Sequence, residues 1–142
     1  MGSPELQQFQ SEVERLAAVI GAPASLLPTY GRSEDFARPH IEFLGGQFHF
    51  VVEERGVQLQ RESSPNPDDI LYSVFEGITF SMAGDYEVRH RRPSEDSRRQ
   101  LFDVQLQLLG KLSGDWQQRR RAHLGEILRQ YPFSDEPRPS RQ

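Results

Sequence analysis

The chain has 142 residues, of which 27% are charged, nine are Phe, one is Trp and none is Cys. This length suits one domain with a sizeable core, and the lack of cysteine excludes disulfides, thiolate nucleophiles and zinc–thiolate sites. The net charge is −4, and residues 1–72 hold eleven acidic against five basic side chains, which disfavours nucleic acid and attracts basic partners. No segment approaches the ~18 apolar residues of a membrane helix and no secretion signal is visible, so we expect a soluble protein.

The first predicted element is an amphipathic helix that begins at Pro4. Ser3 is a good N-cap, proline suits the first helical position, and Gly21 with Pro23 ends the periodic pattern. Apolar residues recur at helical spacing and should face the core: Leu6, Phe9, Val13, Leu16, Ala17 and Ile20. A long proline-rich connection over residues 22–39 follows, and connections of this length often carry function.

Residues 40–62 give the clearest strand signal. Gly45-Gly46 predicts a two-residue hairpin turn, because glycine tolerates the positive φ of such turns. The turn then predicts three cross-strand pairs: Phe43 with Phe48, Ile41 with Phe50, and Glu42 with His49. A second connection of even length, such as Arg55-Gly56 or residues 53–56, would bring Val57 and Leu59 onto the core face and complete a three-stranded antiparallel meander.

Three further helices are predicted after the meander. Asn66-Pro67 caps the first, Pro93-Ser94 breaks the chain before the second, and Gly114-Asp115 opens the third. The predicted fold class is α+β: an N-terminal helix, the three-stranded antiparallel meander, and three helices packed on one face of the sheet. We expect one domain over residues 1–133 and a disordered polar tail over residues 134–142.

No catalytic or metal motif is found in the sequence. The four histidines show neither HExxH nor another metal-ligand spacing: His40, His49, His90 and His123. There is no GxSxG, glycine-rich phosphate loop or CxxC, so we predict no metal, no cofactor and no enzymatic activity. His40 and Glu42 share a strand face that would suit acid–base chemistry, but the same pattern is typical of the polar outer face of a sheet.

Two features could suggest a nucleic-acid partner, and each has a structural interpretation. Arg119, Arg120 and Arg121 spread around ~200° of a helix, because each residue turns ~100°, so we interpret them as an exposed helix exterior. The phenylalanines of the predicted sheet resemble the stacking platforms of RNA-binding sheets, yet a helix-covered sheet needs the same residues for its core. We therefore predict no nucleic-acid partner.

The stretch around Pro93 is dense in charge. Glu87 lies on the same helix face as His90 and Arg91, and Asp96 falls in the first turn of the next helix, where the dipole favours a carboxylate. Opposite charges at such a helix corner would form a structural network, and breaking a buried member would leave another charge without a partner. A partner-contact surface and a catalytic site are the other interpretations. The predicted network has six members: Glu87, His90, Arg91, Asp96, Arg98 and Arg99.

Several short elements follow one another in the last two thirds of the chain: an aromatic–acid pair before a basic cluster, D-x-R-R, F-x-x-Q-x-x-L-L and P-F-x-D. They are Tyr86-Glu87 with His90-Arg91, Asp96 with Arg98 and Arg99, Phe102 with Gln105 and Leu108-Leu109, and Pro132-Phe133 with Asp135. In this combination the chain resembles the bacterial immunity protein 63 family of polymorphic toxin systems. The resemblance implies a cytoplasmic protein that binds and neutralises one cognate toxin without catalysis.

Our leading hypothesis is an inhibitory binding protein for a toxin, and acidic side chains would suit a basic one. The contact residues are chosen by charge alone: Glu34, Asp35, Glu53, Glu54, Asp68 and Asp69. Two alternatives stay open. One is a small enzyme that reverses a toxin's modification, with Glu87, His90 and Asp96 in a cleft. The other is a nucleic-acid-binding regulator that uses residues 119–121.

Overall fold

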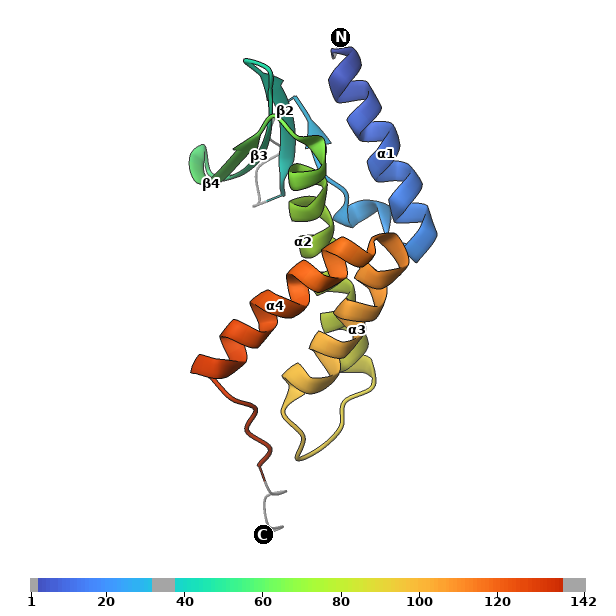
Figure 1. Ribbon diagram of the computed structural model, residues 1–142, viewed down its shortest axis with the longest axis vertical. Helices are drawn as coiled ribbons and strands as arrows, with labels where there is room; N and C mark the ends of the chain where they lie inside the picture. Colours follow the sequence, from blue (N-terminus) through green and yellow to red (C-terminus); the bar gives the residue numbers. More distant parts are fainter. Residues whose placement is uncertain (1–2, 32–37, 137–142) are drawn as a thin grey trace. The chain divides into compact units, whose positions relative to one another are not determined.

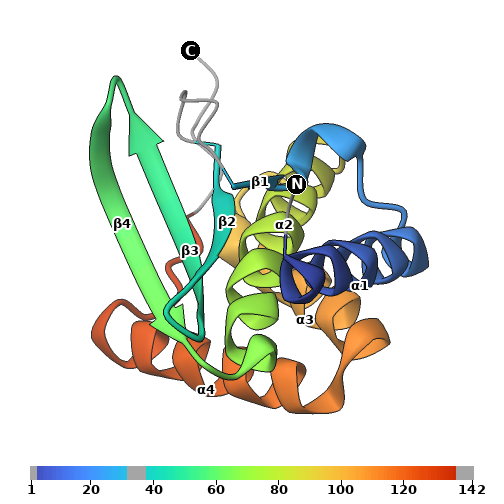
Figure 2. The same ribbon diagram turned by 90° about the horizontal axis from the view of Figure 1, so that it is seen from above.

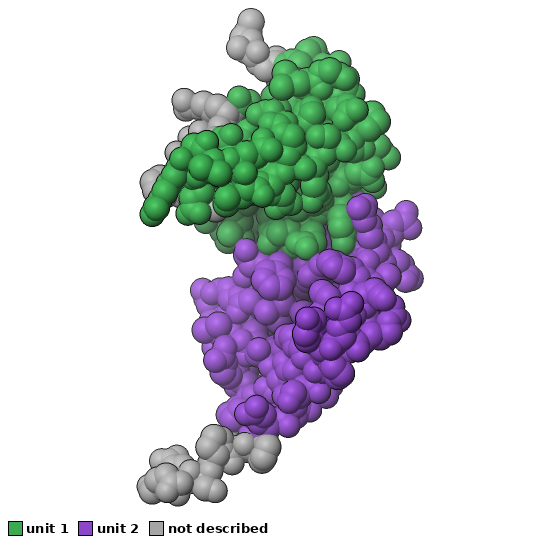
Figure 3. Space-filling view, turned by 90° about the vertical axis from the view of Figure 1, so that its left-hand side faces the viewer, with its two compact units in different colours: residues 1–78 green, residues 79–142 purple. Residues whose placement is uncertain are grey.

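The structure is a computed structural model that describes residues 3–31 and 38–136. Its helices and strands are shown in Figure 1 and Figure 2. The chain divides into two compact units, residues 1–78 and 79–142, coloured separately in Figure 3. The boundary falls within one long helix, α2 (Pro67–Arg89). The first unit holds the sheet, and the second holds the last two helices.

Helix α1 (Pro4–Ile20) forms as the sequence predicts. The Ser3 hydroxyl accepts a hydrogen bond from the Leu6 N–H at 3.1 Å, which satisfies one of the unpaired amides at the helix start. Gly21 ends the helix with φ of +66°, a conformation that glycine adopts at little cost. All six predicted core residues of this helix are buried. The Phe9 ring stacks on Phe48 of the sheet, with 5.2 Å between ring centroids.

The sheet has four strands in the order β1-β2-β3-β4: β1 (Thr29–Tyr30), β2 (His40–Leu44), β3 (Gln47–Glu54) and β4 (Val57–Ser64). Strands β2, β3 and β4 form the predicted antiparallel meander (Figure 2). A 3₁₀ turn, η1 (Ala24–Leu26), precedes β1, which pairs parallel with β2. The described sheet is therefore mixed and has four strands where the sequence predicted three. A two-residue strand carries no alternation of apolar and polar residues that could mark it.

The hairpin between β2 and β3 has the predicted register. Gly45 and Gly46 have φ of +62° and +74°, the left-handed conformation that this two-residue turn requires. All three predicted pairs are present: Phe43 with Phe48, Ile41 with Phe50, and Glu42 with His49. Ile41, Phe48 and Phe50 are buried, so the two buried rings are core rather than an open platform for bases.

The prediction for the core face of β4 was wrong. The turn has an even number of residues as predicted, Arg55-Gly56, but Val57 and Leu59 are 59% and 57% exposed. The β3–β4 register shifts after Val52, which leaves Leu59 as the extra residue of a bulge, and Val57 lies at the hairpin tip opposite the exposed Glu54. Alternation of core-facing and outward-facing residues holds only where the strand pairing is uninterrupted and one sheet face is buried. The pairing of β4 is interrupted by the bulge, and the strand is exposed.

The first half of α2 completes the core of the first unit. Pro67 occupies the first helical position as predicted, and the Asn66 side-chain oxygen accepts a hydrogen bond from the Asp68 N–H at 3.0 Å. The buried apolar side chains of this half lie on the stripe that the sequence predicted: Ile70, Leu71, Val74, Phe75 and Ile78.

The second unit consists of the end of α2, helix α3 (Ser97–Leu112), helix α4 (Gly114–Gln130) and the segment after α4. Asp96 caps α3 by accepting from the Arg98 N–H, and Ser113 caps α4 by accepting from the Trp116 N–H. Helix α3 packs against α4. The predicted arrangement, three helices on one sheet face, therefore differs from the structure, in which α3 and α4 belong to a separate compact unit.

The predicted limits of the domain, residues 1–133, and of the disordered tail, residues 134–142, stay predictions. Within the tail, Ser134 and Asp135 make hydrogen bonds that are described below, and residues 137–142 lie outside the described residues. No helix within 3–31 and 38–136 combines the length and the apolar character needed to cross a bilayer.

Candidate interaction surface

The acidic residues predicted to contact a partner lie in three pairs along the chain: Glu34-Asp35, Glu53-Glu54 and Asp68-Asp69. The first pair lies outside the described residues. The second pair ends β3 at the tip of the β3–β4 hairpin, the third opens α2, and β4 lies between them. A strand of this length spans roughly 25 Å, so the second and third pairs do not form one patch.

The two described pairs differ in how free their side chains are. The Ser64 hydroxyl donates a hydrogen bond to Asp69 Oδ2 at 2.9 Å, and Asp69 is half-buried. Asp68 is exposed in the first turn of α2, where a carboxylate complements the helix dipole. Glu54 is exposed and Glu53 half-buried at the hairpin tip. The hairpin tip is therefore the place where predicted contact residues project from the sheet.

The predicted charge network divides into two parts, and the first lies on α2. Arg91 donates two hydrogen bonds to Glu87, from Nη2 at 2.7 Å and from Nε at 3.1 Å. Glu87 is buried and Arg91 is exposed, so an arginine at the surface pairs with a buried carboxylate. His90 takes no part in this pair. Its Nδ1–H donates to the Tyr86 carbonyl at 3.0 Å, and its ring stacks on the Tyr86 ring.

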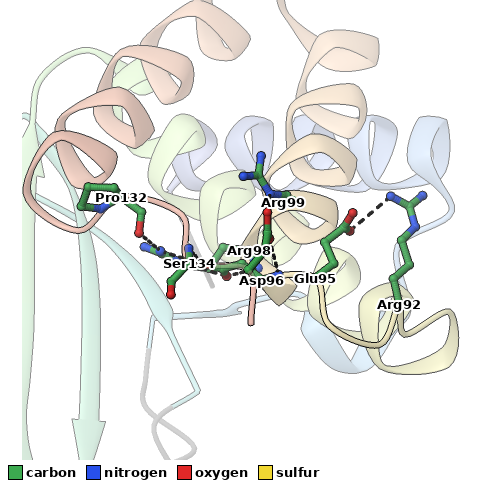
Figure 4. A network of polar contacts seen from close by, with 8 residues as sticks. Arg92, Glu95, Asp96, Arg98, Arg99, Pro132 and Ser134 are labelled. Carbon is green, nitrogen blue, oxygen red and sulfur yellow. Dashed lines mark hydrogen bonds and ion pairs between the residues drawn. The ribbon is translucent and has the colours of Figure 1, made fainter. Parts of the chain in front are cut away.

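The second part lies at the start of α3 (Figure 4). Asp96 accepts hydrogen bonds from the Arg98 guanidinium at 2.9 Å, the Ser134 N–H at 2.9 Å and the Arg98 N–H at 3.0 Å. These donors, the Arg98 side chain above all, hold the pKa of the Asp96 carboxyl well below its usual range. Arg98 also donates to the carbonyls of Tyr131 and Pro132 at 2.9 and 2.8 Å. Asp96 and Arg98 therefore tie the start of α3 to the segment that follows α4.

Arg99 adds a second tie to the same segment. Asp135 accepts from Arg99 Nε at 3.0 Å and from the Asp96 N–H at 2.8 Å, and these two hydrogen bonds lower the pKa of the Asp135 carboxyl. The Phe133 ring lies against both arginines, with 4.3 Å from its centroid to the Arg99 guanidinium carbon. We call residues 131–136 the C-terminal strap.

The sequence predicted one network at a helix corner, and the structure shows two separate groups of contacts whose second group has its main partners elsewhere in the chain. Among the described residues, no hydrogen bond or ion pair joins Glu87 or Arg91 to the charges at the start of α3. Ser134 and Asp135 supply those contacts instead, and the P-F-x-D element was their only signal in the sequence.

The catalytic interpretation required Glu87, His90 and Asp96 to converge in a cleft. Each has its own partner, as described above, and no hydrogen bond joins any two of them in the part of the chain that the structure describes. A pocket of about 650 Å³ lies elsewhere, between α1, Phe48 and the start of α2 in the first unit, and none of the three lines it. No group of three or more metal-ligand side chains is placed to hold a metal within the described residues.

His40 and Glu42 do meet on β2, where His40 is buried and Glu42 is half-buried. His40 Nε2 lies 2.8 Å from Glu42 Oε2, and Arg61 Nη1 lies 3.3 Å from Glu42 Oε1. Burial alone would raise the pKa of Glu42, but the hydrogen bond with His40 and the charge of Arg61 lower it more. His40 is only 2% exposed, so it lies in the core and not on the open polar face that the sequence predicted.

The basic run at residues 119–121 is not one exposed patch. Arg120 is only 4% exposed and donates from Nε to Gln105 Oε1 at 3.1 Å. Gln105 donates in turn to Thr79 Oγ1 at 3.2 Å. The prediction that the whole run is exposed was wrong for Arg120, because α4 turns this arginine inward between two exposed neighbours. The break in the run weakens the case for phosphate contact.

The most exposed strand of the sheet is β4, at the outer edge in Figure 2. It is the last strand in the sheet order, so one of its edges has no neighbouring strand within the described residues. Its first seven residues are all exposed, two apolar side chains among them. Edge strands with free backbone groups and apolar side chains are common places for another chain to bind. We call residues 53–64 the hairpin arm and take it as the candidate interaction surface.

A protein-family model described as Immunity protein 63 matches residues 45–126, more than half of the chain. The match includes β3, β4, α2, α3 and most of α4, and hence the whole hairpin arm, but not the C-terminal strap. No curated protein and no solved structure matches the chain. The chain therefore belongs to the Immunity protein 63 family.

Proposed function

We propose that this protein is an immunity protein that binds a cognate protein toxin and neutralises it by contact, without catalysis. The observation that carries the proposal is the family match over residues 45–126. An immunity protein protects the cell that makes the toxin, so the proposed place of action is the bacterial cytoplasm. The proposal needs neither a cofactor nor a membrane.

Two features of the hairpin arm support the proposal physically. The arm offers exposed apolar side chains and a strand edge that no other described strand pairs with, and both features suit a protein-binding surface. Glu53 and Glu54 at its tip add negative charge, which would attract a basic toxin and orient it on approach. Asp68 and Asp69, about one strand length away, would contact only a toxin large enough to cover β4.

The first test is protection of growing cells. A candidate toxin domain from a neighbouring gene is expressed from an inducible promoter, with and without this protein, and we expect cells that express the toxin to grow only when this protein is also present. A purified mixture should also give a complex with one toxin domain per chain by calorimetry and light scattering. A folded protein that neither protects cells nor forms this complex would contradict the proposal.

The stoichiometry of protection separates contact from enzymatic reversal. A binding inhibitor must match the toxin mole for mole, whereas an enzyme that removes a toxin's modification protects at a small fraction of that amount. We expect inhibition of the purified toxin to reach completion near equal molar amounts. Complete protection at substoichiometric amounts would instead support the enzyme alternative.

A further inference from the structure

We propose that the open edge of β4 receives an extended segment of the toxin as an added antiparallel or parallel β-strand. The inference rests on the function proposed above and deepens it, because it names the surface and the kind of partner segment that fits it. Strand addition uses main-chain hydrogen bonds for affinity and alternate side chains for specificity.

The register of the middle strand β3 shows which β4 residues face the open edge. Residues along an antiparallel strand turn their N–H and C=O alternately to one neighbour and to the other. Each two-residue turn is closed by a pair of residues that hydrogen-bond each other through their backbones, Leu44 with Gln47 and Glu54 with Val57. Along β3, the backbone groups of odd-numbered residues therefore bond β2, and those of even-numbered residues bond β4. The β4 residues opposite odd-numbered β3 residues therefore turn their backbone groups to the open edge: Gln58, Arg61 and Ser63.

The edge lacks most of the features that guard edge strands against other chains. Natural proteins protect such edges with short strands, lysine, proline or bulges. Strand β4 has eight residues with neither lysine nor proline, and its one guard is the bulge at Leu59. Its two charged side chains are engaged within the first unit: Arg61 with Glu42 and Gln58, and Glu62 with the Ser73 hydroxyl. The backbone groups of β4 that face away from β3 are therefore accessible to another strand.

The side chains around the edge specify the chemistry of the partner segment. Val57 and Leu59 are exposed near the turn, and Glu53 and Glu54 follow at the tip. An added strand would lay apolar side chains against the first two and a lysine or arginine beside the glutamates. A second copy of this chain fits less well, because the one cation of its β4, Arg61, is already bound by Glu42. An extended toxin segment with apolar residues and a basic end fits the edge.

Hydrogen exchange on the complex with the neighbouring toxin domain tests the inference. In the free protein, the backbone amides that face the open edge should exchange quickly, while the Glu62 amide, which bonds β3, should exchange slowly. On binding we expect the edge amides to slow by at least about tenfold, the effect of one added hydrogen bond of ~1.4 kcal/mol. The Glu62 amide serves as the internal control. The three reporter amides are Gln58, Arg61 and Ser63.

A proline substitution tests the same backbone groups by affinity. Ser63→Pro removes one outward N–H and leaves the ladder to β3 intact, since edge strands accept proline where the N–H faces outward. We expect the toxin Kd to rise at least about tenfold. Ser63→Ala is the matched control, because it also loses the hydroxyl contact with His49 at 2.7 Å but keeps the N–H. Gln58→Pro with Gln58→Ala forms a second pair, should Ser63→Pro fail to fold.

The outcomes separate this inference from the proposed function. Binding without slowed exchange at the edge amides, or equal affinities for a folded proline variant and its alanine control, overturns the edge inference and leaves the proposed function standing. No binding by the unaltered protein overturns both. Slowed exchange that grows with protein concentration in the absence of toxin assigns the edge to a second copy and overturns the inference.

Discussion

Arg120 carries a positive charge into the core of the second unit, where its Nε donates to Gln105. Gln105 in turn donates to Thr79, and all three side chains are buried. A buried guanidinium is tolerated only while its N–H groups have acceptors, so the members of this network depend on one another. The network fixes how α3 and α4 face each other, because Gln105 and Arg120 lie on those two helices.

We expect Arg120→Ala to lower the free energy of unfolding by ~3 kcal/mol, because it leaves a buried amide without its donor and opens a cavity. Arg121→Ala is the matched control, since that side chain is exposed on the same helix, and it should change the free energy by less than ~0.5 kcal/mol. Urea unfolding followed by circular dichroism gives both values. Equal losses would show that the buried network contributes nothing specific.

Asp96 links the stability of the second unit to pH. Its hydrogen bonds with Arg98 and with the Ser134 N–H lower the pKa of its carboxyl in the folded state. A group with a lower pKa in the folded than in the unfolded state stabilises the fold above the unfolded value, ~3.9 for Asp. The contribution is lost as the pH falls through that value toward the folded pKa. Acid should therefore weaken the contact between the C-terminal strap and α3.

We expect the unaltered protein to lose stability progressively below a pH of about 5, and Asp96→Asn to lose less over the same range. Near neutral pH the variant should be less stable, because asparagine still caps α3 but no longer attracts Arg98 as a charge. Urea unfolding at a series of pH values measures both curves, and their difference removes the contribution of distant carboxyls such as Glu42. Parallel curves would show that Asp96 does not carry the acid sensitivity.

At the scale of the elements, the C-terminal strap makes its contacts with the Phe133 ring, the Asp135 carboxylate and a set of backbone groups. Phe133 lies against Arg98, Arg99 and Phe102, whereas Tyr131 contributes its carbonyl and leaves its side chain exposed. We expect Phe133→Ala to cost about 1 kcal/mol of unfolding free energy, from lost ring contacts and lost cation–π attraction. Tyr131→Ala is the control and should have little effect. Similar losses in both variants would contradict a specific role for the ring.

The elements that the sequence predicted well are those whose signals are local. Helix α1 follows from a cap, a proline and one apolar stripe, and the β2–β3 register follows from Gly45-Gly46 alone. The missed features depend on distant partners. Strand β1 exists only because β2 lies beside it, and the bulge at Leu59 has no sequence mark. Likewise, the Arg99 partner Asp135 lies 36 residues away, where no spacing rule applies.

At the scale of the whole molecule, the family match runs from the β2–β3 turn in the first unit, through the hairpin arm, to α4 in the second. Charge alone selected three acidic pairs, but it could not tell that β4 would separate two of them by roughly 25 Å. The pair at the hairpin tip, Glu53 and Glu54, remains beside the open strand edge. If a basic toxin approaches this tip, the glutamates should accelerate its association more than they strengthen the final complex.

Reversing both charges, Glu53→Lys with Glu54→Lys, should therefore slow toxin association about tenfold at low salt and change dissociation less. Stopped-flow association rates at increasing salt measure the effect, which should shrink as salt screens the charges. The control is Glu14→Lys with Asp103→Lys, two exposed acids outside the arm, which raises the net charge from −4 to 0 in the same way. If both double variants slow association equally, net charge rather than the hairpin tip steers the toxin, and the tip loses its assigned role. If only the tip variant slows association, the toxin first approaches the hairpin tip, which lies next to the open edge of β4.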